Sequence, residues 1–130
     1  MNVSVSAFLL NRSSDLPAID LRLGRIAVQR GLATAAVRQG GRQLDAVLAG
    51  TPSKSELQHL STLVRAGVGA AVHVVLDETR TLAGPVGLAF DAALTHAVTD
   101  LDLYVRQQNT DGDAAYLGAR LRDPGPAGRG

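Results

Sequence analysis

The chain lacks cysteine and tryptophan, and its 130 residues include only two phenylalanines and two tyrosines. Without cysteine it forms no disulfide, no thiolate metal site, no iron–sulfur cluster and no thiol nucleophile. With so few aromatic side chains, packing must come from leucine, valine, isoleucine and many alanines, and small side chains favour closely packed helices. The composition therefore favours a helical protein without cysteine chemistry.

A strong charge of either sign and a long apolar run are also absent. Thirteen basic residues balance 12 acidic ones, so the net charge is +1 and attracts neither nucleic acid nor an anionic membrane. The longest apolar run, Val5 to Leu10 interrupted by Ser6, is too short to span a bilayer and lacks the flanks of a signal peptide. We therefore expect one soluble, cytoplasmic domain with no nucleic-acid or membrane partner.

Three regions are predicted along the chain. Residues 1–18 carry turn signals that include Pro17, and we expect an irregular segment there. Residues 19–121 show helical periodicity and form the predicted bundle. Residues 122–130 are rich in Pro and Gly and are predicted to be a disordered tail.

The first helix is predicted from Asp20, as a candidate cap, to about Leu48. Apolar residues recur at helical spacing over this range, but the Gly40-Gly41 pair interrupts it. Because glycine costs about 1 kcal/mol against alanine inside a helix, this pair marks either a close backbone contact or a kink.

The second helix has the clearest start in the chain. Ser53 and Glu56 form an S-x-x-E capping box after Gly50. One apolar stripe follows it: Leu57, Leu60, Val64, Gly67 or Val68, Ala71, Val75 and Leu82. The run from Gly84 to Gly87, Gly-Pro-Val-Gly, is predicted to end this helix and to form a hinge between antiparallel helices.

A third helix is predicted from about Leu88 to Asn109. Its expected inward residues are Phe90, Leu94, Ala97, Leu101, Tyr104 and Val105. Residues 110–113 interrupt the pattern, and Asp113 is a candidate cap for a short final helix through Leu121. The predicted fold is thus all-α, with three long antiparallel helices and a short C-terminal helix, and we found no metal-ligand run.

The segment 100–109, Asp-Leu-Asp-Leu-Tyr-Val-Arg-Gln-Gln-Asn, followed by Tyr116-Leu117-Gly118, carries a family resemblance. It is similar to the end of the C-terminal helical domain of acyl-CoA dehydrogenases and related flavin-dependent monooxygenases. In that family the bundle forms tetramers and helps to bind FAD. The resemblance places Arg106, Gln107, Gln108 and Asn109 in a cofactor-facing segment, whereas their position at a helix end is equally explained by capping.

Three departures from the family narrow this expectation. The first bundle helix has no counterpart, Gln108 and Asn109 replace a pair of histidines, and no glutamate follows Glu78. We therefore expect no classical dehydrogenation by this chain alone and, in the first instance, no cofactor, with FAD as the second expectation. Because each helix of a four-helix bundle packs against two neighbours, the missing helix predicts a groove filled by a second copy, a partner protein or a ligand. The N-terminal segment Val3–Leu10 could also fold over this groove.

Candidate chemistry is concentrated on the third helix. His96 and Asp100 lie one turn apart, so Asp100 could orient the imidazole as a general base, although such pairs are also common on helix surfaces. Tyr104 could hydrogen-bond a ligand, although core packing explains it too. Asp102 and Arg106 form a second pair with this spacing. His59 and His73 lie opposite the apolar stripe of the second helix and are predicted to be exposed or to lie at an oligomer contact.

Three functions are compatible with these residues. The first is an oligomeric, acyl-CoA dehydrogenase-like helical domain that binds an apolar or acyl-type small molecule. The second is a non-catalytic partner subunit of a full-length flavoenzyme. The third is a cofactor-free cyclase or isomerase that uses His96, Asp100 and Tyr104.

Overall fold

The computed structural model describes residues 16–125 and is all-α over this range, as predicted. Its four helices are α2 (Leu16–Leu48), α3 (Lys54–Phe90), α4 (Ala92–Arg106) and α5 (Thr110–Arg122). Most of the segment predicted to be irregular and most of the predicted tail lie outside the described residues. Residues 16–18 of the former belong to α2, however, and Arg122 of the latter ends α5.

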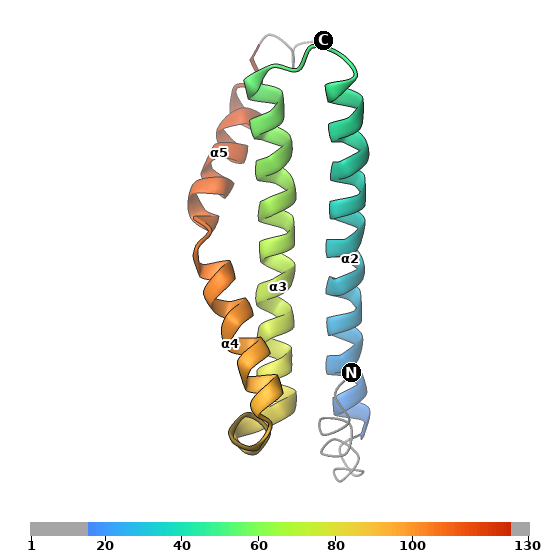
Figure 1. The fold of residues 1–130 in the computed structure, drawn as a ribbon, viewed down its shortest axis with the longest axis vertical. Coiled ribbons are helices and arrows are strands. Elements are labelled where there is room, and N and C mark those ends of the chain that lie inside the picture. Colours follow the sequence, from blue (N-terminus) through green and yellow to red (C-terminus); the bar gives the residue numbers. More distant parts are fainter. Residues whose placement is uncertain (1–15, 126–130) are drawn as a thin grey trace.

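The helices form a flat arrangement around α3. α2 runs antiparallel to α3 on one side, while α4 and α5 follow each other back along its other side (Figure 1). The contacts between helices are mainly those that α3 makes with α2, α4 and α5. One long helix therefore organises the described part of the molecule.

α2 starts one turn before the predicted cap. Asp20 lies inside the helix, because Pro17 is accommodated in its first turn, where its missing N–H leaves no bond unmade. The residues of α2 that are not exposed follow one alternating three- and four-residue spacing: Ile19, Arg22, Ile26, Gln29, Ala33, Ala36, Gly40 and Val47. This spacing is typical of an antiparallel coiled-coil contact with α3, and we call this line of residues the seam.

Gly40 marks a close contact and not a kink. α2 is continuous through this residue, which is buried. A Cβ atom at position 40 would lie 2.6 Å from Cγ2 of Val64 on α3. Of the two interpretations of the glycine pair, the structure thus supports close approach of the two helices.

α3 begins with the predicted capping box. The Glu56 backbone N–H donates to Oγ of Ser53 at 3.1 Å, and the Ser53 backbone N–H donates to Oε2 of Glu56 at 2.8 Å. These bonds lower the pKa of Glu56. The predicted apolar stripe is buried or half-buried except at Gly67, which is exposed, so Val68 is the stripe residue at that turn. A second buried line recurs every seven residues on the side of α4 and α5, namely Thr62, Gly69, Leu76 and Ala83.

The chain reverses after α3 in two steps. Gly84 has a positive φ of 63° inside α3 and bends it, so the predicted hinge is where the change of direction starts. The helix nevertheless continues to Phe90, and Asp91 completes the reversal by accepting the Leu94 backbone N–H at 3.0 Å as the cap of α4. The Thr95 hydroxyl also donates to the Leu88 carbonyl across this turn.

The predicted third helix is shorter than expected. α4 ends at Arg106, and Asn109 caps α5 by accepting the Gly112 backbone N–H at 2.9 Å. The prediction that Asp113 caps the last helix was wrong, because this carboxylate lies within α5 and pairs with Arg65 of α3.

Within the described residues the core is thin. Seven hydrophobic residues are buried, and no large side chain is completely enclosed. The inward positions predicted for the third helix are only partly correct: Val105 of α4 is buried, whereas Phe90, which ends α3, is 86% exposed and Tyr104 of α4 is 66% exposed. Apolar surface that a bundle would normally bury is therefore left open.

α3 is also long and apolar enough to cross a membrane. Its best window of 18 residues has a mean hydropathy of 1.4, and 22% of that window is buried. Length and composition alone decide this criterion, and the core helix of a soluble bundle meets it as well. The observation shows how apolar α3 is and leaves the location of the protein open.

Candidate functional site

The main candidate site is a groove over α3 between α2 and α4, which we call the central groove. Its volume is about 490 Å³. Its walls and floor include Val37 and Leu44 of α2, Leu60, Val64 and Val68 of α3, and Tyr104 and Gln108 near the end of α4. The lining is mainly apolar, and the groove lies where the sequence predicted an uncovered surface.

Two of the predicted site residues meet in the central groove. Tyr104 is exposed along it, and Gln108 is half-buried at its end. The Gln108 Oε1 atom is buried and has no hydrogen-bond partner within the described chain. Gly69 permits this position, because a Cβ atom there would lie 2.9 Å from Gln108 Oε1. Gln108 thus presents an unused acceptor in apolar surroundings.

The other two predicted catalytic residues lie on exposed α4 surface. His96 Nε2 is 3.0 Å from Asp100 Oδ2, and the two side chains are 77% and 67% exposed. Among the described residues, no hydrogen bond or ion pair joins either side chain to Tyr104. Because exposed pairs of this kind are strongly solvated, the geometry resembles a surface pair more than an activated general base.

The remaining predicted cofactor-facing residues have structural partners. Arg106 Nε donates to Asp102 Oδ2 at 3.1 Å. Gln107 is the C-cap of α4, with its backbone N–H directed at the Tyr104 and Val105 carbonyls, and Asn109 caps α5. Of the four residues, Gln108 is the one whose side chain lines the groove.

α5 is attached to α3 by a bidentate ion pair that the sequence analysis missed. Arg65 donates to the two oxygens of Asp113 at 2.9 and 2.6 Å. The hydrogen bonds from Arg65 lower the pKa of Asp113, and the same bonds raise the pKa of Arg65. The residues are 48 positions apart, so no spacing rule could have paired them.

Two further ion-pair groups connect α3 to its neighbours. Arg80 of α3 lies 3.2 Å from Asp102 of α4, which also accepts from Arg106. Glu78 of α3 lies 2.9 Å from Arg22 and 3.5 Å from Arg25, both on α2. These charged side chains therefore pair with one another between neighbouring helices.

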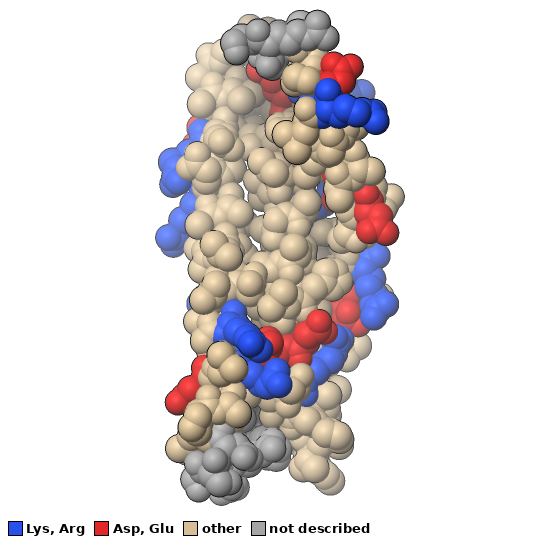
Figure 2. Space-filling view, turned by 180° about the vertical axis from the view of Figure 1, so that it is seen from behind, with Lys and Arg blue, Asp and Glu red and all other residues tan. Residues whose placement is uncertain are grey.

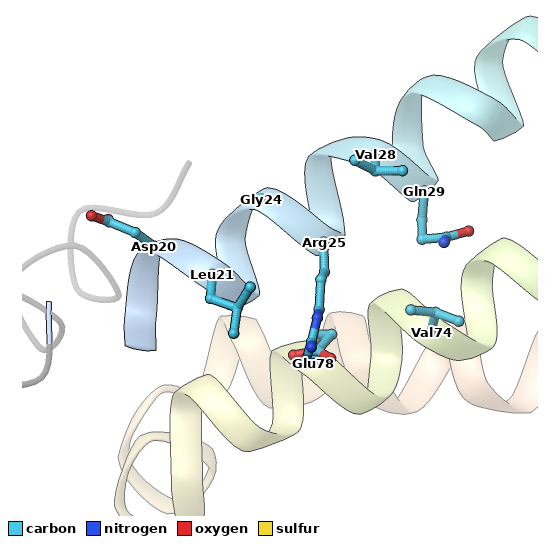
Figure 3. Close-up of a pocket in the computed structure, with 8 residues that line it drawn as sticks. All are labelled: Asp20, Leu21, Gly24, Arg25, Val28, Gln29, Val74 and Glu78. Atoms are coloured by element: carbon cyan, nitrogen blue, oxygen red, sulfur yellow. Dashed lines mark hydrogen bonds and ion pairs between the residues drawn. The ribbon is translucent and has the colours of Figure 1, made fainter. Parts of the chain in front are cut away.

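A second, shallower hollow lies along the outer side of the α2–α3 seam and is shown in Figure 3. Arg25 reaches from α2 toward Glu78, and Asp20 points away. The apolar surface of the hollow comes from Leu21, Val28 and Val74. Its volume is about 650 Å³. Arg25 and Glu78 pair with each other, and Asp20 points away from them, so the charged groups of this hollow do not converge on one point.

The histidines of α3 differ in their surroundings. His73 is exposed, as predicted, but His59 is half-buried, which corrects the prediction of an exposed side chain. The His59 ring centroid lies 6.5 Å from that of Tyr116 on α5. The correction arises because α5 covers this flank of α3, a contact that the periodicity of α3 alone could not show.

A line of exposed apolar residues runs beside the seam on α2. Leu16, Leu23, Val37 and Leu44 differ by seven or fourteen positions, and Arg30 occupies the remaining position. Val37 and Leu44 of this line form one wall of the central groove. Figure 2 shows a face on which uncharged atoms occupy the middle of the molecule, while charged atoms gather along its margins and lower part.

No family model, curated protein or solved structure matches the chain. Among the described residues, no group of three or more His, Cys, Asp or Glu side chains could hold a metal ion. The arrangement can bind an apolar partner in the central groove, with one amide acceptor at its end.

Proposed function

We propose that the chain is an assembly subunit whose central groove receives α2 of a second copy. The two α2–α3 pairs then form a four-helix bundle across a two-fold axis, with each groove filled by the other chain. The observation that supports this proposal most is the line of exposed apolar residues on α2, which recur at multiples of seven positions. Val37 and Leu44 of this line form one wall of the central groove.

The spacing of that line supports a helical occupant. In a bundle, a helix that packs against two neighbours has apolar residues at its seam positions and also along one line beside the seam. A helix that packs against one neighbour needs apolar residues at the seam positions alone. On α2 the seam is occupied by α3, and the flanking line remains apolar at Leu16, Leu23, Val37 and Leu44. A second helical neighbour accounts for these positions, of which Val37 is 55% exposed.

A second copy is favoured because one surface can supply both halves of the contact. An isologous dimer places the same patch on both sides of the interface. The line on α2 can fill the partner's groove while its own groove receives the partner's line. The helix is also long enough, since its 33 residues extend over about 50 Å.

Burial by protein explains the apolar character of α3 better than burial by lipid. Arg65, Glu78 and Arg80 all lie on α3 and pair with neighbouring helices. Charged side chains inside a bilayer are costly, whereas at the margins of a soluble bundle they remain partly hydrated. We accordingly propose a soluble, cytoplasmic oligomer.

The second candidate is an apolar or acyl-type small molecule in the same groove. The unpartnered Gln108 Oε1 favours it, because a ligand hydroxyl or amide could donate to this atom. An origin in the acyl-CoA dehydrogenase family, a flavoenzyme partner, FAD and catalysis by His96, Asp100 and Tyr104 remain predictions from the sequence.

The test of the dimer is Leu44→Glu, measured by sedimentation velocity. Leu44 is 39% exposed and lines the groove, so a carboxylate there would be buried without a partner in the dimer. We expect the variant to sediment as a monomer at a concentration at which the unaltered chain is a dimer.

Leu121→Glu is the matched control. Leu121 lies on α5, is 87% exposed and does not line the central groove, so the same change should leave the dimer intact. If Leu44→Glu and Leu121→Glu sedimented alike as dimers, the central groove would not be the interface. Saturable uptake of an apolar small molecule by a monomeric chain would favour the second candidate.

A further inference from the structure

A second pocket lies where α2 ends, α3 begins and α5 ends, and we call it the junction pocket. It shares one lining residue, Leu60, with the central groove. Gln43 and Val47 of α2, His59 and Leu63 of α3, and Arg120 of α5 line it. Its volume is about 380 Å³, which is within the range of about 300–1,000 Å³ typical of small-molecule sites. Three helices therefore converge on a space of ligand size.

Arg120 is the cation of the junction pocket. Its Nη1 donates to Ser55 Oγ at 2.8 Å, and no carboxylate pairs with it within the described chain. The arginines that join α3 to its neighbours, Arg22, Arg65 and Arg80, all have carboxylate partners. Since a guanidinium carries five N–H donors in a planar fork, Arg120 retains donors that suit a carboxylate.

Two polar groups near Arg120 also lack hydrogen-bond partners in the described chain. His59 lines the pocket, and its Nδ1 atom is buried without a hydrogen-bond partner in the described chain. The hydroxyl of the neighbouring Tyr116 is likewise buried and unpartnered. A ligand group that reaches Nδ1 of His59 would supply the hydrogen-bond partner that this atom lacks in the described chain.

The rest of the pocket is apolar and has little opposing charge. Leu63 is 49% exposed beside Val47. Glu56 is the carboxylate of the pocket, and its Oε2 accepts the Ser53 backbone N–H at 2.8 Å as part of the helix cap. An apolar body against Leu63 and an anionic group at Arg120 therefore match the lining.

We propose that the junction pocket binds a small carboxylate with an apolar body, with Arg120 holding the carboxylate and His59 donating or accepting a further hydrogen bond. This site does not depend on the dimer, because it lies at the helix ends, and Leu44, the residue that tests the dimer, does not line it.

The experiment is an amide NMR titration of the full chain with phenylacetate, with phenylethanol as the uncharged match. We expect saturable shifts at Gln43, His59, Leu63 and Arg120, and much weaker binding of phenylethanol. Arg120→Gln should weaken phenylacetate binding about tenfold or more, because it removes a charge-assisted pair. Arg120→Lys should restore part of the affinity by restoring the charge.

Arg122→Gln is the control variant, since Arg122 lies two residues along the same helix, is exposed and does not line the pocket. It should bind phenylacetate as the unaltered chain does. Absence of saturable shifts, equal affinity of Arg120→Gln and the unaltered chain, or shifts confined to Tyr104 and Gln108 would overturn the proposal. None of these results would bear on the sedimentation of the Leu44→Glu variant.

Discussion

The two flanks of α3 are built from different chemistry. Toward α2, small residues allow close approach, with Gly40 against Val64, and the spacing is that of a coiled-coil seam. Toward α4 and α5, the fixed points are the Arg80–Asp102 and Arg65–Asp113 ion pairs together with the caps at Asp91 and Asn109. Glu78 also pairs with Arg22 and Arg25 near one end of the seam, and the buried line from Thr62 to Ala83 faces α4 and α5. The α2 flank therefore relies mainly on shape, whereas the other flank adds directed polar contacts between α3 and each of its two short helices to its apolar contact.

This difference explains where the molecule is left open. A further helix can pack beside the α2–α3 seam, because the line of α2 residues that flanks the seam is apolar as well. Directed ion pairs fix α4 and α5 at particular points and leave Tyr104 beside an uncovered groove. The apolar flank is therefore the side on which assembly is proposed.

Of the substitutions that test this difference between the two flanks, Gly40→Val should have the largest effect on the free energy of unfolding. Two methyl groups would be added where even a Cβ atom lies 2.6 Å from Val64. Overpacking of this kind costs about 1–3 kcal/mol, so the free energy of unfolding in urea should fall by that amount at fixed protein concentration.

Gly31→Val is the matched change on the same helix, since nothing lies within 4 Å of the position of its Cβ. It should change the free energy of unfolding little. If both variants unfolded alike, close approach of α2 and α3 at Gly40 would not be the source of the seam's stability.

A smaller effect is expected on the other flank from Asp113→Asn, which removes the charge paired with Arg65. Because the pKa of Asp113 is lowered from its ordinary value of 3.8, its stabilisation is present above that pH and is lost as the pH falls through the lowered value. The melting temperature of the variant should be lower at neutral pH, and the difference should shrink below about pH 4.

Asp111→Asn provides the comparison for this pH series, because Asp111 is exposed in the first turn of the same helix. Its melting temperature should stay close to that of the unaltered chain throughout. A difference between Asp113→Asn and the unaltered chain that persisted undiminished at low pH would show that the ionised pair is not what attaches α5.

The smallest effect should follow His96→Ala. His96 is exposed and its contact is with Asp100 on the same helix, so the free energy of unfolding should change by less than about 0.5 kcal/mol. Urea titration measures this directly. A loss well above that value would mean that His96 has a partner beyond α4, as a site in an oligomer would require.

The helices themselves were largely predictable because their signals are local. The capping box at Ser53 and Glu56 lies within four residues, and the apolar stripe of α3 follows one period. The start of α2 differs from the predicted one because proline is typical of turns but is also compatible with a first helical turn, where Pro17 lies. Asp113 was misassigned because a capping residue and a long-range ion-pair partner look the same in sequence.

The candidate site was predictable only in part. The sequence indicated an uncovered groove, with Tyr104 as a possible ligand contact, and Tyr104 lines the central groove. Gln108, which was predicted to face a cofactor or to cap a helix, lines the same groove. Arg106, Gln107 and Asn109 are occupied by an ion pair and by helix ends. The junction pocket could not be anticipated, because His59, Arg120 and Gln43 come from three helices whose ends meet only in the folded chain.

The molar mass of the unaltered chain in solution tests the central claim most directly. Light scattering coupled to size exclusion at micromolar concentration should give about 27 kDa, twice the chain mass of 13.5 kDa. A single species of 13.5 kDa across the accessible concentration range would contradict the proposal that a second copy fills the central groove.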